Sequence, residues 1–280
     1  MTARFSFKVI PLDISWKELS TIWQEADNAG FFDAGWVFDH FYPPRGPVRP
    51  MFEAWTLLAS LAAVTTQLRL GVMVTSNTFR HPALLAHMAA SVDQVSGGRL
   101  EIGLGTGWHE AEHAAFGIEL GTAAERWQRL EEALTIIDGL LTQDTYSFSG
   151  SQFQLSEATL ALKGVQQPRP PLVIGGIGPR RTMPLVARWA DHWNYFNPGA
   201  PPEALREHLD RLRGLCEAIG RDPSEIEVSV QIRNLESASE LTDLAGRYLD
   251  AGADHILVTA FPPVTADTVP GIATALAPLR

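Results

Sequence analysis

The chain has 280 residues and a formal net charge of −10 at pH 7, and 45% of its residues are hydrophobic while 19% are charged. This composition supports a sizeable core and argues against wholesale disorder, and the acidic balance argues against nucleic acid or an anionic membrane as the main partner. The single cysteine, Cys216, excludes a disulfide framework within the chain and suits a reducing cytoplasm, and no stretch approaches the roughly 20 apolar residues of a membrane span.

Strands and helices are predicted to alternate along the chain. Strands are expected at residues 5–10, 33–39, 69–74, 100–105, 171–176, 191–196, 225–232 and 254–260. Helices are expected at 15–30, 52–66, 82–98, 109–116, 123–141, 179–190, 202–219, 238–251 and 267–279. Continuous apolar strands that alternate with helices indicate a parallel sheet that is covered on both faces. Eight such units in about 250 residues predict a (β/α)8 TIM barrel, with a doubly wound open sheet as the alternative.

The segment 143–169 interrupts this alternation. It is rich in Ser, Gly and Gln, contains two short β-like pieces (TYSFSG and QFQLS), and ends in QQPRPP. We interpret it as an insertion before the fifth strand, lying against a single domain that spans residues 1–280.

Polar residues follow the second predicted strand, in the sequence WVFDHFYPP. The chemistry of a parallel barrel lies where its strands end, and histidine is the side chain best suited to exchange a proton near neutral pH. Asp39 and His40 are therefore candidate catalytic residues. The alternative is that Asp39 caps a loop and His40 has a structural role.

Three glycines follow the fifth predicted strand, in the sequence VIGGIGPRRT. Pro179 stands where the next helix is expected to start, so that free backbone N–H groups would point outward and bind an anion. Gly175, Gly176 and Gly178 are therefore predicted to form a phosphate-binding turn, with an ordinary tight βα turn as the alternative.

His109, Glu110 and His113 spell H-E-x-x-H, the motif of many zinc proteases. Here the motif directly follows G-L-G-T-G-W, so that it occupies the first turn of a short helix, and Phe116 stands where the extended motif has glycine. No metal is therefore expected, and a zinc hydrolase is kept as a remote alternative.

Together these segments resemble the bacterial luciferase-like family of flavin and deazaflavin oxidoreductases, and most closely its branch that uses coenzyme F420. The resemblance covers essentially the whole chain. It is carried by GWVFDHFYPP, by the long segment from TSNTFRHP to GTGWHEAEHAAFGIEL, and by PLVIGGIGPRRTMPLVARWADHWNYF. The family fold is a (β/α)8 barrel with an insertion, often dimeric, and its G-x-G-W segment accounts for HEAEH without a metal.

The resemblance implies roles for individual residues. Asp39 and His40 match a pair close to the redox ring, with His40 handling a proton or polarising the ring and Asp39 orienting it. The step from Met73 to Val74 matches a non-proline cis peptide in a bulge of the third strand, which backs the ring. The other expected coenzyme contacts are Thr75, Ser76, Thr106 and Gly107, with Gly175, Gly176 and Gly178 at the phosphate.

One departure concerns the substrate. Sugar-phosphate dehydrogenases of this family place a glutamate directly after the T-G pair, where this chain has Trp108. The proton donor therefore stays open. The aromatic residues near the strand ends suggest an apolar or aromatic pocket, and they are Trp36, Phe41, Tyr42, Trp108 and Trp193. We expect a cytoplasmic, homodimeric oxidoreductase that moves a hydride between F420 and a small organic substrate. The alternative is an FMN-dependent monooxygenase on the same barrel.

Overall fold

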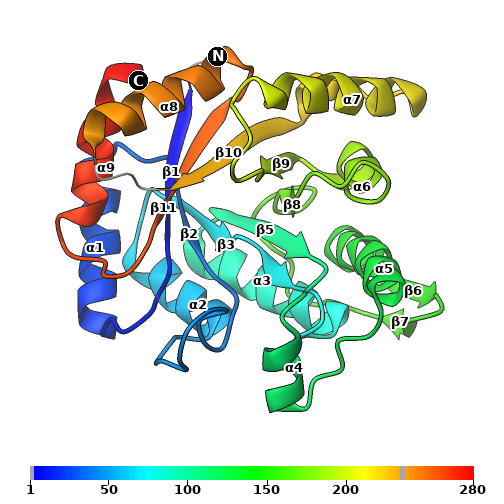
Figure 1. The fold of residues 1–280 in the computed structure, drawn as a ribbon. Helices are drawn as coiled ribbons and strands as arrows, with labels where there is room; N and C mark the ends of the chain where they lie inside the picture. Colours follow the sequence, from blue (N-terminus) through cyan, green and yellow to red (C-terminus); the bar gives the residue numbers. More distant parts are fainter. Residues whose placement is uncertain (1–2, 234–236) are drawn as a thin grey trace.

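Parallel strands form a closed barrel in this computed structural model, which describes residues 3–233 and 237–280 (Figure 1). The strands are β1 (Arg4–Val9), β2 (Ala34–Val37), β3 (Arg69–Val72), β4 (Thr75–Ser76), β5 (Leu100–Gly105), β8 (Leu172–Gly175), β9 (His192–Tyr195), β10 (Glu227–Arg233) and β11 (His255–Ala260). β3 and β4 are two parts of one barrel strand, and the ring closes because β1 pairs with β11 and β3 with β5. The predicted (β/α)8 barrel is confirmed, and the doubly wound open sheet is wrong.

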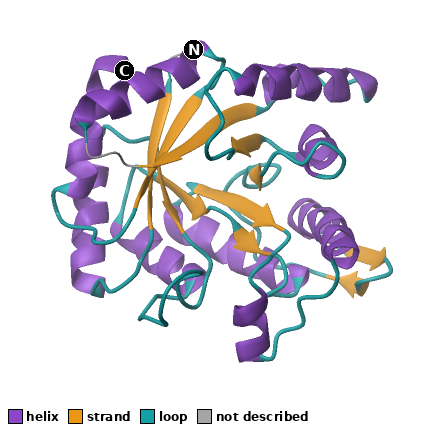
Figure 2. Ribbon diagram, viewed as in Figure 1, coloured by secondary structure: helices purple, strands orange, loops and turns teal. Residues whose placement is uncertain are grey.

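Helices cover the outside of the barrel, and one short helix at residues 110–116 lies apart from this layer (Figure 2). They are α1 (Trp16–Ala29), α2 (Ala54–Val64), α3 (Pro82–Ser96), α4 (Glu110–Phe116), α5 (Ala123–Thr142), α6 (Thr182–Trp189), α7 (Ala204–Ala218), α8 (Ala238–Asp250) and α9 (Thr268–Leu276). Local signals define their ends. The side chains of Ser15 and Glu18 each accept a hydrogen bond from the other's backbone N–H at the start of α1, and Gly30 ends it in the left-handed conformation at a φ of 64°. None of the described helices is long and apolar enough to cross a membrane.

Side chains alternate between the two faces of each barrel strand. In β1, Phe7 points outward and packs edge-on against Trp23 of α1, with ring centroids 5.1 Å apart. Ser6 and Lys8 point inward, where Ser6 is bonded to His255 and Lys8 reaches a cavity. The barrel interior thus combines polar side chains with a small apolar cluster of Ala34, Trp36, Met73, Val173 and Leu257.

Buried ionisable groups fill the N-terminal end of the barrel. His192 donates to Glu101 at 3.1 Å, His255 donates to Glu227 at 2.7 Å, and the two imidazole rings stack at 5.5 Å. Arg4 pairs with Glu227 and lies 3.5 Å from Glu101. Burial opposes ionisation here, but the hydrogen bond from His255 and the nearby positive charges lower the pKa of Glu227 to about 2.

The predicted insertion contains the antiparallel strands β6 (Tyr146–Ser149) and β7 (Gln154–Ala158), which form a sheet apart from the barrel. The hairpin packs on α5, where a Cβ at Gly139 would lie 2.4 Å from the ring of Tyr146. Glu132 of α5 accepts backbone hydrogen bonds from Ser151 and Phe153. The segment therefore lies against the body of the protein, as expected.

Candidate active site

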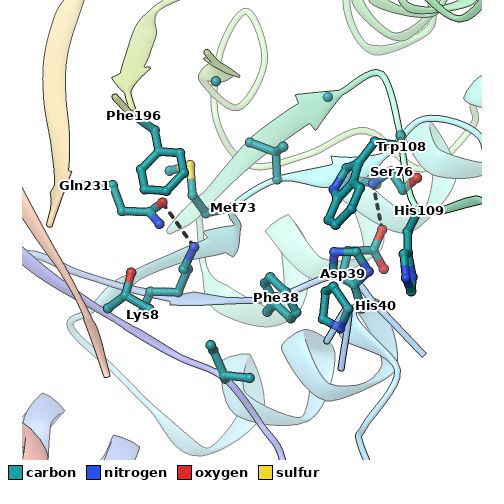
Figure 3. A pocket seen from close by; sticks show the side chains of 18 of the residues that line it. Lys8, Phe38, Asp39, His40, Met73, Ser76, Trp108, His109, Phe196 and Gln231 are labelled. Carbon is teal, nitrogen blue, oxygen red and sulfur yellow. Dashed lines mark hydrogen bonds between the residues drawn. The ribbon is translucent and has the colours of Figure 1, made fainter. Parts of the chain in front are cut away.

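A cavity of about 720 Å³ opens at the C-terminal ends of the barrel strands. Its volume is typical of a small-molecule site, and its place is where barrels carry their chemistry. Figure 3 shows the side chains around it. The predicted site residues that line it are Asp39, His40, Met73, Val74, Thr75, Ser76, Thr106, Gly107, Gly175 and Gly176.

Asp39 is held by a buried ion pair. Its two carboxylate oxygens accept hydrogen bonds from Arg80 at 2.8 and 3.0 Å, and Oδ2 also accepts from the backbone N–H of Ser76 at 2.8 Å. Burial opposes the charge of Arg80, but the carboxylates of Asp39 and Glu53 raise its pKa. Asp39 therefore joins the end of β2 to β4 and fixes one wall of the cavity.

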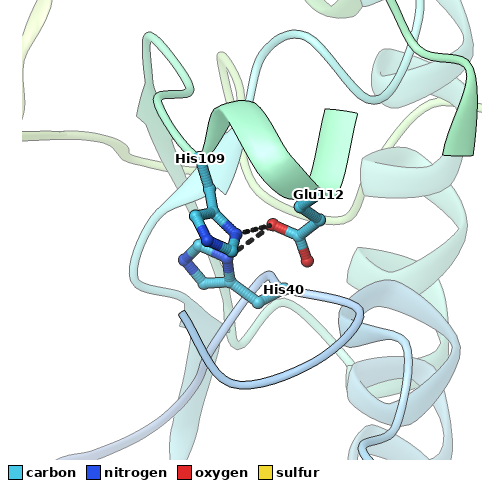
Figure 4. Close-up of side chains that lie close together, drawn as sticks. All are labelled: His40, His109 and Glu112. Atoms are coloured by element: carbon cyan, nitrogen blue, oxygen red, sulfur yellow. Dashed lines mark hydrogen bonds and ion pairs between the residues drawn. The ribbon is translucent and has the colours of Figure 1, made fainter. Parts of the chain in front are cut away.

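His40 is oriented by Glu112 of α4 (Figure 4). Its Nδ1 donates to Oε2 of Glu112 at 2.8 Å, and His109 donates to the same oxygen at 3.3 Å. The other oxygen of Glu112 accepts from the backbone N–H of Phe41. Burial opposes ionisation of Glu112, but these hydrogen bonds lower its pKa. The expectation that Asp39 orients His40 is corrected: the orienting carboxylate is Glu112, and Asp39 is engaged by Arg80.

The H-E-x-x-H residues do not converge on one point. His113 donates from Nδ1 to the backbone oxygen of His109 at 2.8 Å, and its Nε2 lies 2.6 Å from the hydroxyl of Thr78. Both nitrogens of His113 are thus used in hydrogen bonds, while Glu110 is exposed. The geometry does not support the zinc interpretation of this motif. The side chains that do converge are His40, His109 and Glu112, and hydrogen bonds account for their approach.

The third barrel strand contains the expected non-proline cis peptide between Met73 and Val74. It separates β3 from β4, and the side chain of Val74 lies against the glycines of the neighbouring strands. A Cβ at Gly105 would come within 2.6 Å of Cγ2 of Val74, and one at Gly175 within 3.5 Å of Cγ1. Glycine at position 105 is therefore needed for the bulge to approach β5.

The glycine-rich turns line the same cavity. Gly107 has a φ of 75°, and a Cβ there would lie 2.4 Å from Oγ1 of Thr78. Gly176 has a φ of 107°, and its carbonyl accepts a hydrogen bond from Trp193 at 2.8 Å. Gly178 is not among the residues that line the cavity and lies in the turn that leads into α6.

The start of the helix after this turn differs from the prediction. The helix α6 begins at Thr182, whereas the sequence places Pro179 at its start. The backbone N–H of Met183 bonds to the carbonyl of Gly178, and the N-cap residue Arg181 makes no side-chain capping hydrogen bond. The glycine turn is therefore longer than expected, and the end of α6 that faces it carries no side-chain cap.

Aromatic side chains supply much of the remaining lining: Phe38, Phe79, Trp108, Phe196 and Phe261. Trp108 is 58% exposed at the rim, and its ring meets that of His40 edge-on at 5.7 Å. Four aromatic residues expected in the pocket are not among the lining residues: Trp36, Phe41, Tyr42 and Trp193. Trp36 and Trp193 are fully buried core residues, and Tyr42 stacks against Phe116.

The floor of the cavity holds a polar group that the sequence analysis missed. Lys8 is 5% exposed, and its Nζ donates to Oε1 of Gln231 at 3.0 Å. Burial lowers the pKa of Lys8 to about 7. Thr259 of β11 is the register partner of Lys8, and its hydroxyl is buried without a hydrogen-bond partner among the described residues. A lysine among inward-facing positions of a barrel strand is the signal that could have found this site.

Comparison with known proteins agrees with this geometry. A family model described as luciferase-like monooxygenase matches residues 5–256. An FMNH2-dependent dimethylsulfone monooxygenase of Pseudomonas putida is 32% identical over 168 residues, 60% of this chain and 45% of the relative. Pyrimidine monooxygenase RutA of Agrobacterium fabrum is 32% identical over 207 residues, 72% of this chain and 55% of the relative. The chain thus spans about half the length of these curated relatives.

Solved structures share the whole fold. An F420-dependent secondary alcohol dehydrogenase in complex with an F420-acetone adduct superposes with a TM-score of 0.87 and 19% identity, and the match covers 100% of both chains. At this identity the likeness shows the fold alone. The family model, by contrast, covers most of the sequence, from the first barrel strand to the start of the last. The chain therefore belongs to the luciferase-like monooxygenase family of oxidoreductases.

Proposed function

We propose that this chain transfers a hydride between coenzyme F420 and a small organic substrate held in the barrel-mouth cavity. The observation that carries the proposal is the buried pair of His40 and Glu112 on the cavity wall, near the bulge at Met73 and Val74. The likeness in fold to an F420-dependent secondary alcohol dehydrogenase, at a TM-score of 0.87, supports F420 as the coenzyme.

The cavity wall suits a planar ring with a phosphate-bearing tail. The backbone of Gly107 borders the cavity and packs against the hydroxyls of Thr78 and Ser76 so closely that a Cβ at this position would overlap them. The segment from Met73 to Ser76, with Thr106, would lie along the ring. Gly175 and Gly176 would lie closer to the phosphate, and the N-terminus of α6 beyond Gly178 would favour its negative charge.

The bound coenzyme would supply the hydride chemistry, and the protein supplies position and proton handling. Glu112 engages Nδ1 of His40, which leaves Nε2 as the nitrogen to exchange a proton with the substrate oxygen. The hydrogen bond to Glu112 fixes the orientation of the His40 ring, as the carboxylate does in other His–carboxylate pairs. Asp39 holds the cavity wall in place through the hydrogen bonds that it accepts from Arg80 and from the backbone N–H of Ser76. It is a positioning residue in this proposal.

The second candidate is an FMN-dependent monooxygenase. It is favoured by the FMNH2-dependent dimethylsulfone monooxygenase, which is 32% identical over 60% of this chain. Oxygen consumption in the presence of reduced FMN separates the two candidates, because a deazaflavin carries hydride and reacts poorly with oxygen.

Titration of the purified protein with F420 and, separately, with FMN tests the proposal, with cofactor fluorescence as the signal. We expect F420 to bind at least ten-fold more tightly than FMN. A preference for FMN would move the protein to the monooxygenase reaction, and binding of neither would contradict both candidates.

A further inference from the structure

The polar floor of the cavity is not used by the proposed hydride transfer. Lys8 lies on β1, and Figure 3 shows it with Gln231 on the side of the cavity away from His40, Asp39 and Trp108. The side chain of Phe38 lies between the two groups in this view. The cavity therefore has a proton-handling side and a separate cationic side.

The ammonium group of Lys8 has hydrogen-bonding capacity to spare. One proton goes to the amide oxygen of Gln231, and an ammonium has three. The nearby strand ends contribute the hydroxyl of Thr259, which has no partner among the described residues, and the guanidinium of Arg233, which lies over the ring of Phe261 at 5.1 Å. These donors line one cavity.

No carboxylate of the described residues forms an ion pair with Lys8. The groups around it are neutral or positive: Gln231 and Arg233 from β10, Thr259 from β11 and Phe38, whose ring lies 5.7 Å from Nζ. A buried cation without a counterion is costly, because its charge has lost its water. The two carboxylates on the opposite wall, Asp39 and Glu112, are engaged by Arg80 and His40.

We propose that Lys8, together with Gln231 and Thr259, binds the carboxylate of the substrate, so that the substrate is a small monocarboxylate with an apolar or aromatic body. The carboxylate would supply the missing counterion and accept from Lys8, the amide of Gln231 and the hydroxyl of Thr259. The apolar body would lie among Phe38, Phe196 and Met73, which directs the far end of the molecule toward His40. This inference rests on the proposed function only in calling the ligand a substrate.

Binding of the carboxylate should be accompanied by uptake of a proton from solution. Burial lowers the pKa of Lys8 to about 7, so that near pH 8 the amine is largely neutral in the free protein. A carboxylate beside it favours the charged form, and the complex takes up close to one proton. A neutral ligand of the same shape does not produce this uptake.

The test uses cofactor-free protein and a panel of aromatic, alicyclic and straight-chain monocarboxylates, each paired with its primary amide, such as benzoate with benzamide. Affinity is followed by tryptophan fluorescence. Calorimetry at pH 8 in two buffers of different ionisation enthalpy measures proton uptake. We expect at least one acid to bind ten-fold or more tightly than its amide, with proton uptake. Lys8→Met should abolish both the preference and the uptake, while the matched control Lys17→Met, on the exposed side of α1, keeps them.

The inference is overturned if no acid is preferred over its amide by the wild-type protein, or if the preference survives in Lys8→Met. Circular dichroism establishes that the variant is folded. F420 and FMN titrations of the same proteins separate the two proposals. If Lys8→Met loses cofactor affinity but keeps the acid preference, Lys8 binds the cofactor and not the substrate carboxylate, and the inference is overturned. A Lys8-dependent acid preference in a protein that binds neither cofactor would uphold this site and reject the proposed function.

Discussion

His40 and Glu112 are the residues on which the proposed proton transfer depends. General acid–base groups contribute about 100- to 10,000-fold to a rate. We expect His40→Ala to lower kcat by such a factor and to change the dissociation constant of the coenzyme less than about threefold, because cofactor contacts come from other segments. Steady-state kinetics and fluorescence titration measure the two effects. Unchanged turnover would remove His40 from the mechanism.

Glu112→Gln tests the role of the carboxylate itself. The amide keeps the shape but replaces the charge-assisted hydrogen bond that holds the His40 ring, so that we expect kcat to fall by about 10- to 100-fold. The matched control is Glu110→Gln two residues away on the exposed side of α4. Equal effects of the two changes would contradict the role of Glu112.

The burial of Lys8 also affects the stability of the folded protein. Its pKa is lowered from 10.5 to about 7 in the folded protein. A base whose folded pKa is depressed destabilises the fold fully below the folded pKa, and the penalty disappears as pH rises through the unfolded pKa. Lys8→Met should therefore raise the free energy of unfolding by roughly 3–5 kcal/mol at pH 6, and by much less at pH 10. Urea denaturation at the two pH values, with Lys17→Met as control, checks this; an equal gain at both would contradict it.

At the scale of elements, the bulge between β3 and β4 depends on close approach to β5. Gly105→Ala places a methyl group 2.6 Å from Cγ2 of Val74 and should displace the wall of the cavity. Overpacking of this kind costs about 1–3 kcal/mol, and we expect coenzyme affinity to fall at least tenfold. In the control Gly214→Ala on α7, no atom lies within 4 Å of the new methyl group, and the change should stabilise the protein by about 0.5–1 kcal/mol. Unaltered coenzyme affinity in Gly105→Ala would place the binding surface elsewhere.

For the whole molecule, the charged network at the N-terminal end of the barrel predicts sensitivity to acid. The pKa of Glu227 is about 2 in the folded protein, below its ordinary value of 4.5. A depressed carboxyl pKa contributes stability that is complete above about pH 4.5 and is lost as pH falls toward 2. Across that interval, the free energy of unfolding of Glu227→Gln should decrease by roughly 1–3 kcal/mol less than that of the wild-type protein. Thermal melts from pH 6 to pH 2.5 measure it, and parallel curves for both proteins would contradict the assignment.

Much of the barrel follows from local sequence. The alternation of apolar strands with amphipathic helices is a property of neighbouring residues, and so are the Ser15 capping box and the left-handed Gly30. These signals need no distant partner, and the eight predicted units are all present in the described residues. The predicted start of α6 at Pro179 is wrong because the turn that contains Gly178 continues past Pro179. The length of that turn depends on how it packs and not on the proline alone.

What the sequence by itself determined is therefore the order of strands and helices, the family, and the segments that line the cavity. The tertiary structure alone decided which side chains meet. Glu112 reaches His40 across 72 positions, and Lys8 gains Thr259 as a neighbour only when the first and last strands close the ring. Such contacts depend on barrel closure and on which face of each strand points inward. Both are consequences of long-range pairing and are not encoded in any single segment.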